Sequence, residues 1–127
     1  MKPRFIAFLA AAAATVIATG SAQAAGDAAR GEKLFGDCKA CHMTDRTTTG
    51  LGPSLYGVFG RKSGELADFR YSPAFKRSNI TWSPETLDTY ITDPQKLVPG
   101  NRMPYAGMAD ARDRADLIMY LQKRFKE

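Results

Sequence analysis

The feature that most constrains this 127-residue chain is the pentapeptide Cys38-Lys39-Ala40-Cys41-His42. Its spacing, C-x-x-C-H, is typical of a covalent attachment site for c-type haem. Two intervening residues let one helical turn present both sulfurs to the same edge of a porphyrin, where each thiol can add to one vinyl group. The next residue then places an imidazole under the iron. The motif therefore predicts a thioether-bound haem with His42 as its proximal ligand.

Three other interpretations of this motif are a thioredoxin-like redox pair, half of a zinc site and a structural disulfide. Cys38 and Cys41 are the only cysteines of the chain, and His42 is its only histidine. A zinc site would lack a fourth ligand, since structural zinc sites are built mostly from Cys and His. A thioredoxin-type pair is expected next to a strand of a βαβ unit, and no such pattern surrounds the motif. These counts favour haem attachment.

The first 24 residues have the pattern of a cleavable signal peptide. Two basic residues precede an apolar run over 5–18, and residues 22–24 form a small-x-small cleavage signal. An uncleaved membrane anchor is the alternative, but the run is short for a span and is largely alanine. We therefore expect residues 1–24 to be removed on export to the periplasm, and residues 25–127 to form one domain. Export fits haem c, which bacteria attach on the outer side of the cytoplasmic membrane.

The charge balance says little about partners. The chain has 18 Lys and Arg against 13 Asp and Glu, a formal net charge of +5 that falls to +3 without the signal segment. Basic residues are scattered among acidic ones, with no basic run that alternates with aromatic side chains, so nucleic-acid binding is not expected. Mild basicity suits transient docking to an acidic surface, and ordinary solubility explains it equally simply.

Capping signals and apolar periodicity predict three to five short helices and no strand. The expected helices cover 26–36, a short segment started by Ser72-Pro73, 84–93, 94–97 and 110–126. Ser83-Pro84 is a strong helix start, because serine can cap the first turn and proline suits the first helical position. Such short helices bury little core by themselves. We therefore expect an all-α fold whose loops wrap a covalently bound haem.

The second axial position of the iron needs a ligand other than histidine. Methionine is the next candidate, since His/Met ligation is typical of haem proteins that transfer electrons. Met103 lies in a loop with a proline on either side, which can hold a weak thioether at little entropic cost. Met108 has weaker flanking signals, and Met119 is expected to pack in the core. We expect Met103 to be the sixth ligand, which would leave no open position for peroxidase or gas-binding chemistry.

Several motifs follow one another in a recognisable order. They are Gly31–Phe35, Cys38–His42, Gly52–Gly64, Tyr71-Ser72, Ile80–Trp82, Pro99–Met103 and Asp116–Leu121. Together they resemble the class I cytochromes c, in the branch of mitochondrial cytochrome c and its bacterial periplasmic relatives. The likeness covers nearly all of the chain after residue 25. It implies the class I cytochrome c fold, one haem c attached through Cys38 and Cys41, and one-electron transfer rather than catalysis.

The resemblance also implies roles for individual residues. Gly31 would lie where the first helix crosses the last one, near Leu117 and Tyr120. The Pro53 carbonyl would accept a hydrogen bond from the His42 ring and so fix its orientation.

Further positions would surround the cofactor. Arg61, Tyr71 and Trp82 would lie around the haem propionates, and Tyr90 close to the Met103 sulfur. Ordinary core packing is the alternative for each aromatic residue, although a single tryptophan in a small haem domain usually lies near the cofactor.

Some positions depart from the family pattern. Asp37 and Asp110-Ala111 thin the ring of lysines around the haem edge, Asn101 takes a threonine position, and Phe75 replaces an asparagine. The cations left for a positive rim are Lys39, Lys96 and Arg102. These departures affect the choice of partner more than the fold.

The expected function is that of a soluble, monomeric, periplasmic electron carrier of a respiratory or photosynthetic chain. It would dock transiently to membrane complexes, for example a quinol-oxidising cytochrome complex as donor and a terminal oxidase or reaction centre as acceptor. One alternative is a dedicated haem subunit of a single dehydrogenase, which a large exposed apolar patch at the haem edge would favour. The other is a five-coordinate haem sensor or peroxidase in which Met103 is detached from the iron.

Overall fold

The computed structural model describes residues 25–42, 44–45 and 50–125. The helices in this part are α1 (Ala28–Leu34), α2 (Gly36–Lys39), α3 (Pro73–Arg77), α4 (Pro84–Thr92), α5 (Pro94–Leu97) and α6 (Ala111–Arg124). Its only extended pairing is one isolated antiparallel bridge between Lys62 and Thr81. The predicted all-α class is confirmed. The predicted signal peptide, residues 1–24, lies outside the described residues.

Side-chain caps explain where most helices begin. The N-cap side chain accepts a hydrogen bond from a backbone N–H of the first turn in five helices, and proline follows the cap in α3, α4 and α5. These N-caps are Asp27, Ser72, Ser83, Asp93 and Asp110. At Ser83 the Thr86 hydroxyl also accepts from the cap's own N–H, which completes a capping box. The helix starts predicted at Ser72, Ser83, Asp93 and Asp110 therefore follow from local chemistry.

The first predicted helix, 26–36, is two helices in the structure. Asp27 is the N-cap, so α1 starts at Ala28 rather than at Gly26. Phe35 ends α1 and also precedes α2, where the Cys38 and Lys39 N–H groups both donate to the Phe35 carbonyl. The chain therefore begins a second short helix at the haem motif, which the apolar pattern alone did not predict.

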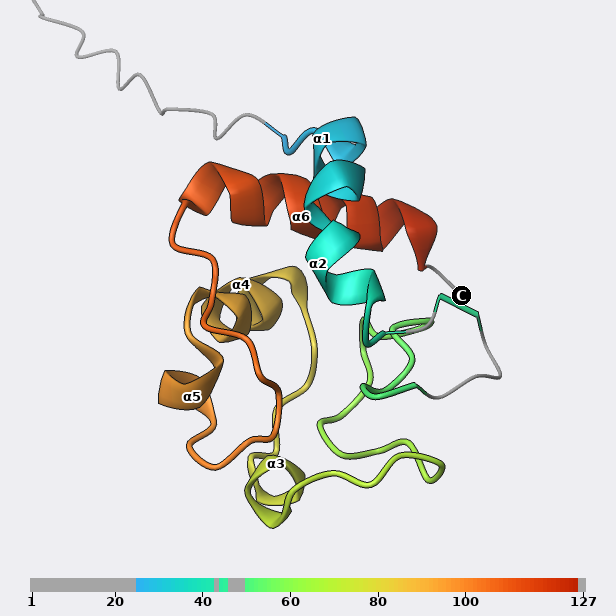
Figure 1. Ribbon diagram of the computed structural model, residues 1–127, viewed down its shortest axis with the longest axis vertical. Coiled ribbons are helices and arrows are strands. Elements are labelled where there is room, and N and C mark those ends of the chain that lie inside the picture. The colour runs from blue at the N-terminus through green and yellow to red at the C-terminus, as the bar shows by residue number, and fades with distance from the viewer. Residues whose placement is uncertain (1–24, 43, 46–49, 126–127) are drawn as a thin grey trace, which may run out of the picture.

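Helices α1 and α6 cross in direct backbone contact (Figure 1). A Cβ atom added at Gly31 would lie 2.0 Å from the Asp116 carbonyl oxygen and 2.8 Å from Cβ of Tyr120. No side chain fits at that position, so the crossing requires glycine. The structure thus has the close approach predicted for Gly31.

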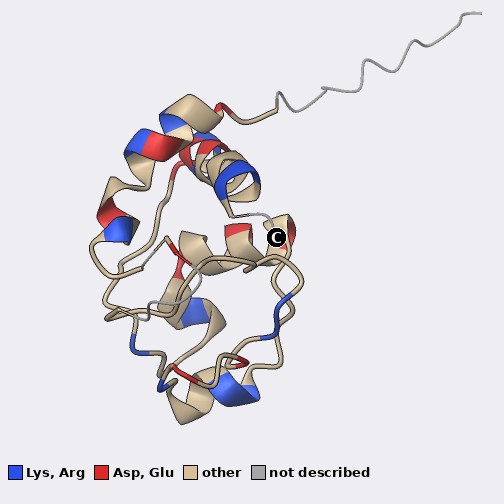
Figure 2. Cartoon of the chain, turned by 90° about the vertical axis from the view of Figure 1, so that its right-hand side faces the viewer, with Lys and Arg blue, Asp and Glu red and all other residues tan. Residues whose placement is uncertain are grey.

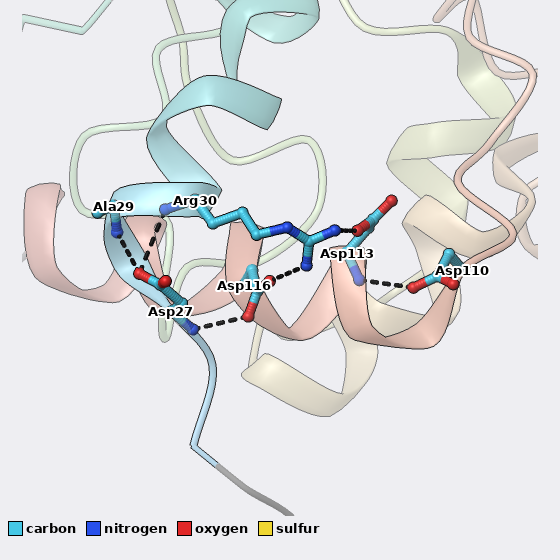
Figure 3. Close-up of polar contacts among 6 residues, drawn as sticks. All are labelled: Asp27, Ala29, Arg30, Asp110, Asp113 and Asp116. Carbon is cyan, nitrogen blue, oxygen red and sulfur yellow. Dashed lines mark hydrogen bonds and ion pairs between the residues drawn. The ribbon is translucent and has the colours of Figure 1, made fainter.

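A buried carboxylate fastens the same crossing (Figure 3). Asp116 is 3% exposed and accepts a hydrogen bond of 2.6 Å from the Asp27 N–H, and the Arg30 guanidinium pairs with both Asp116 and Asp113. The hydrogen bond from Asp27, followed by those from Arg30, lowers the pKa of the Asp116 carboxyl. The carboxylate therefore stays ionised and fixes the register of α1 against α6.

The remaining chain forms loops that extend away from this helix pair and enclose the lower half of the molecule, with α3, α4 and α5 set between them (Figure 1). Phe35, at the end of α1, packs against α6, since its ring contacts Tyr120 and Phe125 at centroid distances of 5.3 and 5.6 Å. Across residues 25–42, 44–45 and 50–125, no helix has the length and apolar character needed to cross a bilayer.

Candidate functional site

A cavity of about 490 Å³ lies between the helices and the loops. All nine residues that the sequence nominated for the cofactor line it: Cys38, Cys41, His42, Pro53, Arg61, Tyr71, Trp82, Tyr90 and Met103. They come from α2, from the loops on either side of α3, from α4 and from the loop before α6. The fold thus brings together positions that lie up to 65 residues apart in the sequence.

The cysteine pair lies at the end of α2. The N–H groups of Cys41 and His42 both donate to the Cys38 carbonyl, at 3.1 and 2.9 Å, so one tight turn carries the whole motif. The two thiols are not joined in a disulfide. Burial, with a smaller contribution from Asp37, raises the pKa of the Cys38 thiol to about 11. An uncharged thiol at the wall of this cavity is suited to lie against an apolar group.

The His42 ring is held from two sides. Its Nδ1 atom donates to the Pro53 carbonyl at 2.7 Å, which is the contact that the resemblance implied. A Cβ added at Gly52 would lie 2.7 Å from Cε1 of the ring, so the glycine leaves room for the imidazole. Burial lowers the pKa of His42, and Arg61 lowers it slightly further, whereas the hydrogen bond to Pro53 raises it. The ring is therefore neutral, with its Nε2 lone pair available to a metal.

Among the described methionines, Met103 is the one that lines the cavity. The Tyr90 hydroxyl donates to its sulfur at 3.5 Å. Burial raises the pKa of Tyr90 to about 12, so this hydroxyl stays protonated and remains a donor. Met108 packs beside the core without lining the cavity. Met119 is half-buried and lies outside the core cluster, so the expectation that Met119 packs in the core is wrong.

Three arginines line the cavity. Arg61 donates to the backbone carbonyls of Tyr56 and Ser54, at 3.1 and 2.7 Å, and burial lowers its pKa. Arg70 and Arg102 also line the cavity. Arg70 was not predicted to lie at the cavity, although its position directly before the matched Tyr71-Ser72 pair was a usable signal. Three guanidinium groups suit the carboxylates of a cofactor.

An aromatic wall closes another side. The Phe75 ring stacks on Tyr71 at 5.3 Å between centroids and meets Trp82 and Tyr90 at 5.9 Å each. The Trp82 and Tyr90 rings are 5.2 Å apart, and Phe69 packs edge-on against Tyr71. Such contacts between rings add to the stability gained from burial alone. Phe75, which sequence reasoning treated only as a departure, lies at the centre of this wall.

These features fit a haem. The volume lies within the range of roughly 300–1,000 Å³ that small-molecule and cofactor sites have. Two thiols on one turn, a neutral imidazole and a thioether suit the porphyrin edge and its iron. The aromatic wall suits the ring, and the guanidinium groups suit its propionates.

Comparison with known proteins agrees with this geometry. The model of the cytochrome c family matches residues 28–124, and the chain belongs to that family. It is 46% identical to cytochrome c 2.1 of Caenorhabditis briggsae over 77% of this chain and 88% of that protein. It is 39% identical to cytochrome c-554 of Methylosinus trichosporium over 97% of this chain and 94% of that protein. The solved structure of cytochrome cH from Methylobacterium extorquens superposes with a TM-score of 0.72, at 45% identity over 77% of this chain and 99% of the other.

Membership of this family establishes the class of cofactor and of activity. Cytochromes c bind covalently attached haem c, for which Cys38 and Cys41 are the two cysteines present. They are electron carriers and not enzymes. The protein is therefore a class I cytochrome c that passes electrons between other redox proteins.

Proposed function

We propose that the protein is a periplasmic one-electron carrier in which His42 and Met103 are the axial ligands of the haem iron. When bound, the haem supplies the one-electron exchange. The observation that carries the proposal is that both side chains line the same cavity with their geometry already fixed. His42 is oriented by Pro53, and the Met103 sulfur by the Tyr90 hydroxyl.

The other cavity residues have supporting roles in this proposal. Arg61, Arg70 and Arg102 pair with the haem propionates, whose negative charge they offset. Tyr71 and Trp82, expected beside the propionates, have the ring of Phe75 against them and would help to exclude water from the bound haem. An apolar surrounding disfavours the extra positive charge of the oxidised iron, as a soft thioether ligand does, so both raise the reduction potential.

The test of the axial ligands uses purified holoprotein. We expect the oxidised parent to have the weak red absorption band of methionine–iron coordination, and its reduced form to bind carbon monoxide slowly. Met103→Ala should lose the band and bind carbon monoxide rapidly. Met119→Ala is the matched control and should keep the parent's behaviour, because its side chain does not line the cavity. If the parent lacks the band and binds carbon monoxide at once, the five-coordinate sensor or peroxidase would be favoured.

Export to the periplasm is supported by residues 1–24, which carry the signal-peptide pattern. Cell fractionation followed by intact mass measurement tests this point. A periplasmic holoprotein whose chain starts at Ala25 is expected, and a retained N-terminus in the membrane fraction would contradict it.

The proposed partners are a quinol-oxidising cytochrome complex as donor and a terminal oxidase or reaction centre as acceptor, with transient docking. Among the described residues the exposed large hydrophobic side chains are Leu51, at 83%, and Leu97, at 37%. Two separate leucines favour brief contacts over the permanent interface of a dedicated subunit. Figure 2 shows acidic and basic residues interleaved, so charge steering should be modest. Weak ionic-strength dependence of electron-transfer rates with isolated membranes would support this docking mode.

A further inference from the structure

The loop that carries Met103 starts with a tight turn after α5. The Asn101 N–H donates to the Val98 carbonyl at 3.1 Å, and Gly100, at φ +85°, occupies the third position of the turn. A proline followed by a residue at positive φ is the pattern of a type II turn. The turn sets the chain direction but leaves open how Met103, two residues further on, is held in place.

The side chain of Asn101 supplies that hold. It is 7% exposed and makes three hydrogen bonds. Its Nδ2 donates to the carbonyls of Pro94 at 2.8 Å and Val98 at 2.9 Å, and its Oδ1 accepts from the Met103 N–H at 2.9 Å. The partners fix the orientation of the amide, because a carbonyl can only accept and a backbone N–H can only donate.

We propose that Asn101 is a positioning residue that keeps the Met103 sulfur at the cavity and thereby slows the opening of the sixth position. This inference rests on the proposed ligand role of Met103. The amide joins the first residue of α5, the turn and the backbone N–H of Met103. Met103 therefore cannot move away from the cavity without breaking a buried hydrogen bond.

Neighbouring contacts leave this task to Asn101. Gln95 donates to the Asn101 carbonyl at 3.0 Å and so fastens the same residue from outside. The far end of the loop is tied separately, by Arg114 donating to the carbonyls of Met108 and Ala109. The two carbonyls that Arg114 contacts are five and six residues beyond Met103. At Met103 itself, the N–H donates to the Asn101 side chain at 2.9 Å, and the carbonyl accepts from the Tyr105 N–H at 2.9 Å. The bond from Tyr105 stays within the loop, whereas the Asn101 amide connects Met103 to α5 and the turn.

The residue type matches the task. Two carbonyls and one N–H require two donors and one acceptor, which one primary amide provides and a single hydroxyl does not. Both amide hydrogens are already used, so Asn101 has no donor left for a haem propionate. Its role is therefore toward the loop backbone and the ligand, and the propionates are left to the arginines.

The experiment compares holoprotein variants by the rate at which imidazole binds the oxidised form, since imidazole can bind only where Met103 has left. Asn101→Ala removes all three contacts, and we expect imidazole to bind about tenfold faster or more, with a weaker red band. Asn101→Ser keeps a hydroxyl that can accept from the Met103 N–H as in an ST turn, so its rate should fall between those of Asn101→Ala and the parent. If Asn101→Ala does not mature, Asn101→Ser still tests the inference, because it should bind imidazole faster than the parent.

Asp27→Ala is the control for a general loss of stability. Asp27 caps α1, far from the loop, and its side chain accepts hydrogen bonds from the Ala29 and Arg30 N–H groups in the first turn of that helix. This variant should unfold more easily and yet bind imidazole at the parent's rate. Parent-like rates and bands in both Asn101 variants would overturn the inference. An Asn101→Ala variant that binds imidazole no faster than Asp27→Ala would overturn it too. A parent that lacks the band would overturn the ligand proposal and this inference together, so the two failures are distinguishable.

Discussion

Gly31→Ala should be the most damaging small substitution at the helix crossing. The new methyl carbon would lie 2.0 Å from the Asp116 carbonyl oxygen and 2.6 Å from its carbonyl carbon. Non-bonded carbon and oxygen are ordinarily about 3.3 Å apart or more. Both clashing atoms belong to the backbone of α6 and cannot rotate away. The helices must therefore separate by on the order of 1 Å.

The cost follows from what that separation disturbs. Forcing a methyl group into a packed contact costs roughly 1–3 kcal/mol, and a gap of 0.5–1 Å removes about a quarter to a half of the dispersion attraction across it. The upper end applies, because the gap also loosens the Phe35–Tyr120 ring contact. Alanine returns up to about 1 kcal/mol in helix propensity. A net loss of about 2 kcal/mol remains, which for about 100 residues lowers Tm by roughly 8–16 °C.

The assay is reversible urea and thermal unfolding of holoprotein, followed by far-ultraviolet circular dichroism. Gly36→Ala is the matched control, because a Cβ at Gly36 would meet nothing within 4 Å. Position 36 is also at negative φ, so alanine there should be neutral or stabilising by about 0.5 kcal/mol. Equal stability of the Gly31 and Gly36 variants would refute the close-contact argument.

Three other perturbations test the site and its support. Gly52→Ala should displace the His42 ring, because the new Cβ lies 2.7 Å from Cε1; a normal yield and spectrum of holoprotein would contradict this. Tyr90→Phe removes the hydrogen bond to the methionine sulfur, which then donates more strongly to oxidised iron, so redox titration should give a lower reduction potential. The pKa of Asp116 is held low first by the N–H of Asp27. The stability that ionised Asp116 contributes to the fold should thus be complete above about pH 5, and it should be lost as the pH falls through the pKa of Asp116 in the folded protein. Asp116→Asn should flatten the acid side of a stability–pH profile, and an unchanged slope would count against it.

Much of the fold was predictable because its signals are local. The C-x-x-C-H motif carries its own geometry, and the Ser, Asp and Pro residues at helix starts act within one turn. The predicted starts at Ser72, Ser83, Asp93 and Asp110 accordingly agree with the structure. The contact between His42 and Pro53 spans eleven residues and came from the resemblance rather than from the pattern.

The rest depends on contacts that a sequence does not encode locally. The division of the first helix at Phe35 follows from tertiary packing of that ring against α6, which outweighs a continuous helical pattern. Arg70 looks like an ordinary surface residue until the loop folds it against the cavity. Asn101 was noted only as a replacement, because its three partners become neighbours only once α5 and the following turn have formed.

The two proposed axial ligands differ in how they are held, and the difference predicts which side of the haem yields first. His42 directly follows a cysteine that carries the cofactor, and it is also held by Pro53 and by the space at Gly52. Met103 has only non-covalent supports, from the Tyr90 hydroxyl and the Asn101 amide. Perturbing the histidine side should therefore impair assembly of the holoprotein. Perturbing the methionine side should leave the haem attached and change ligand exchange and reduction potential, the properties by which an electron carrier is tuned.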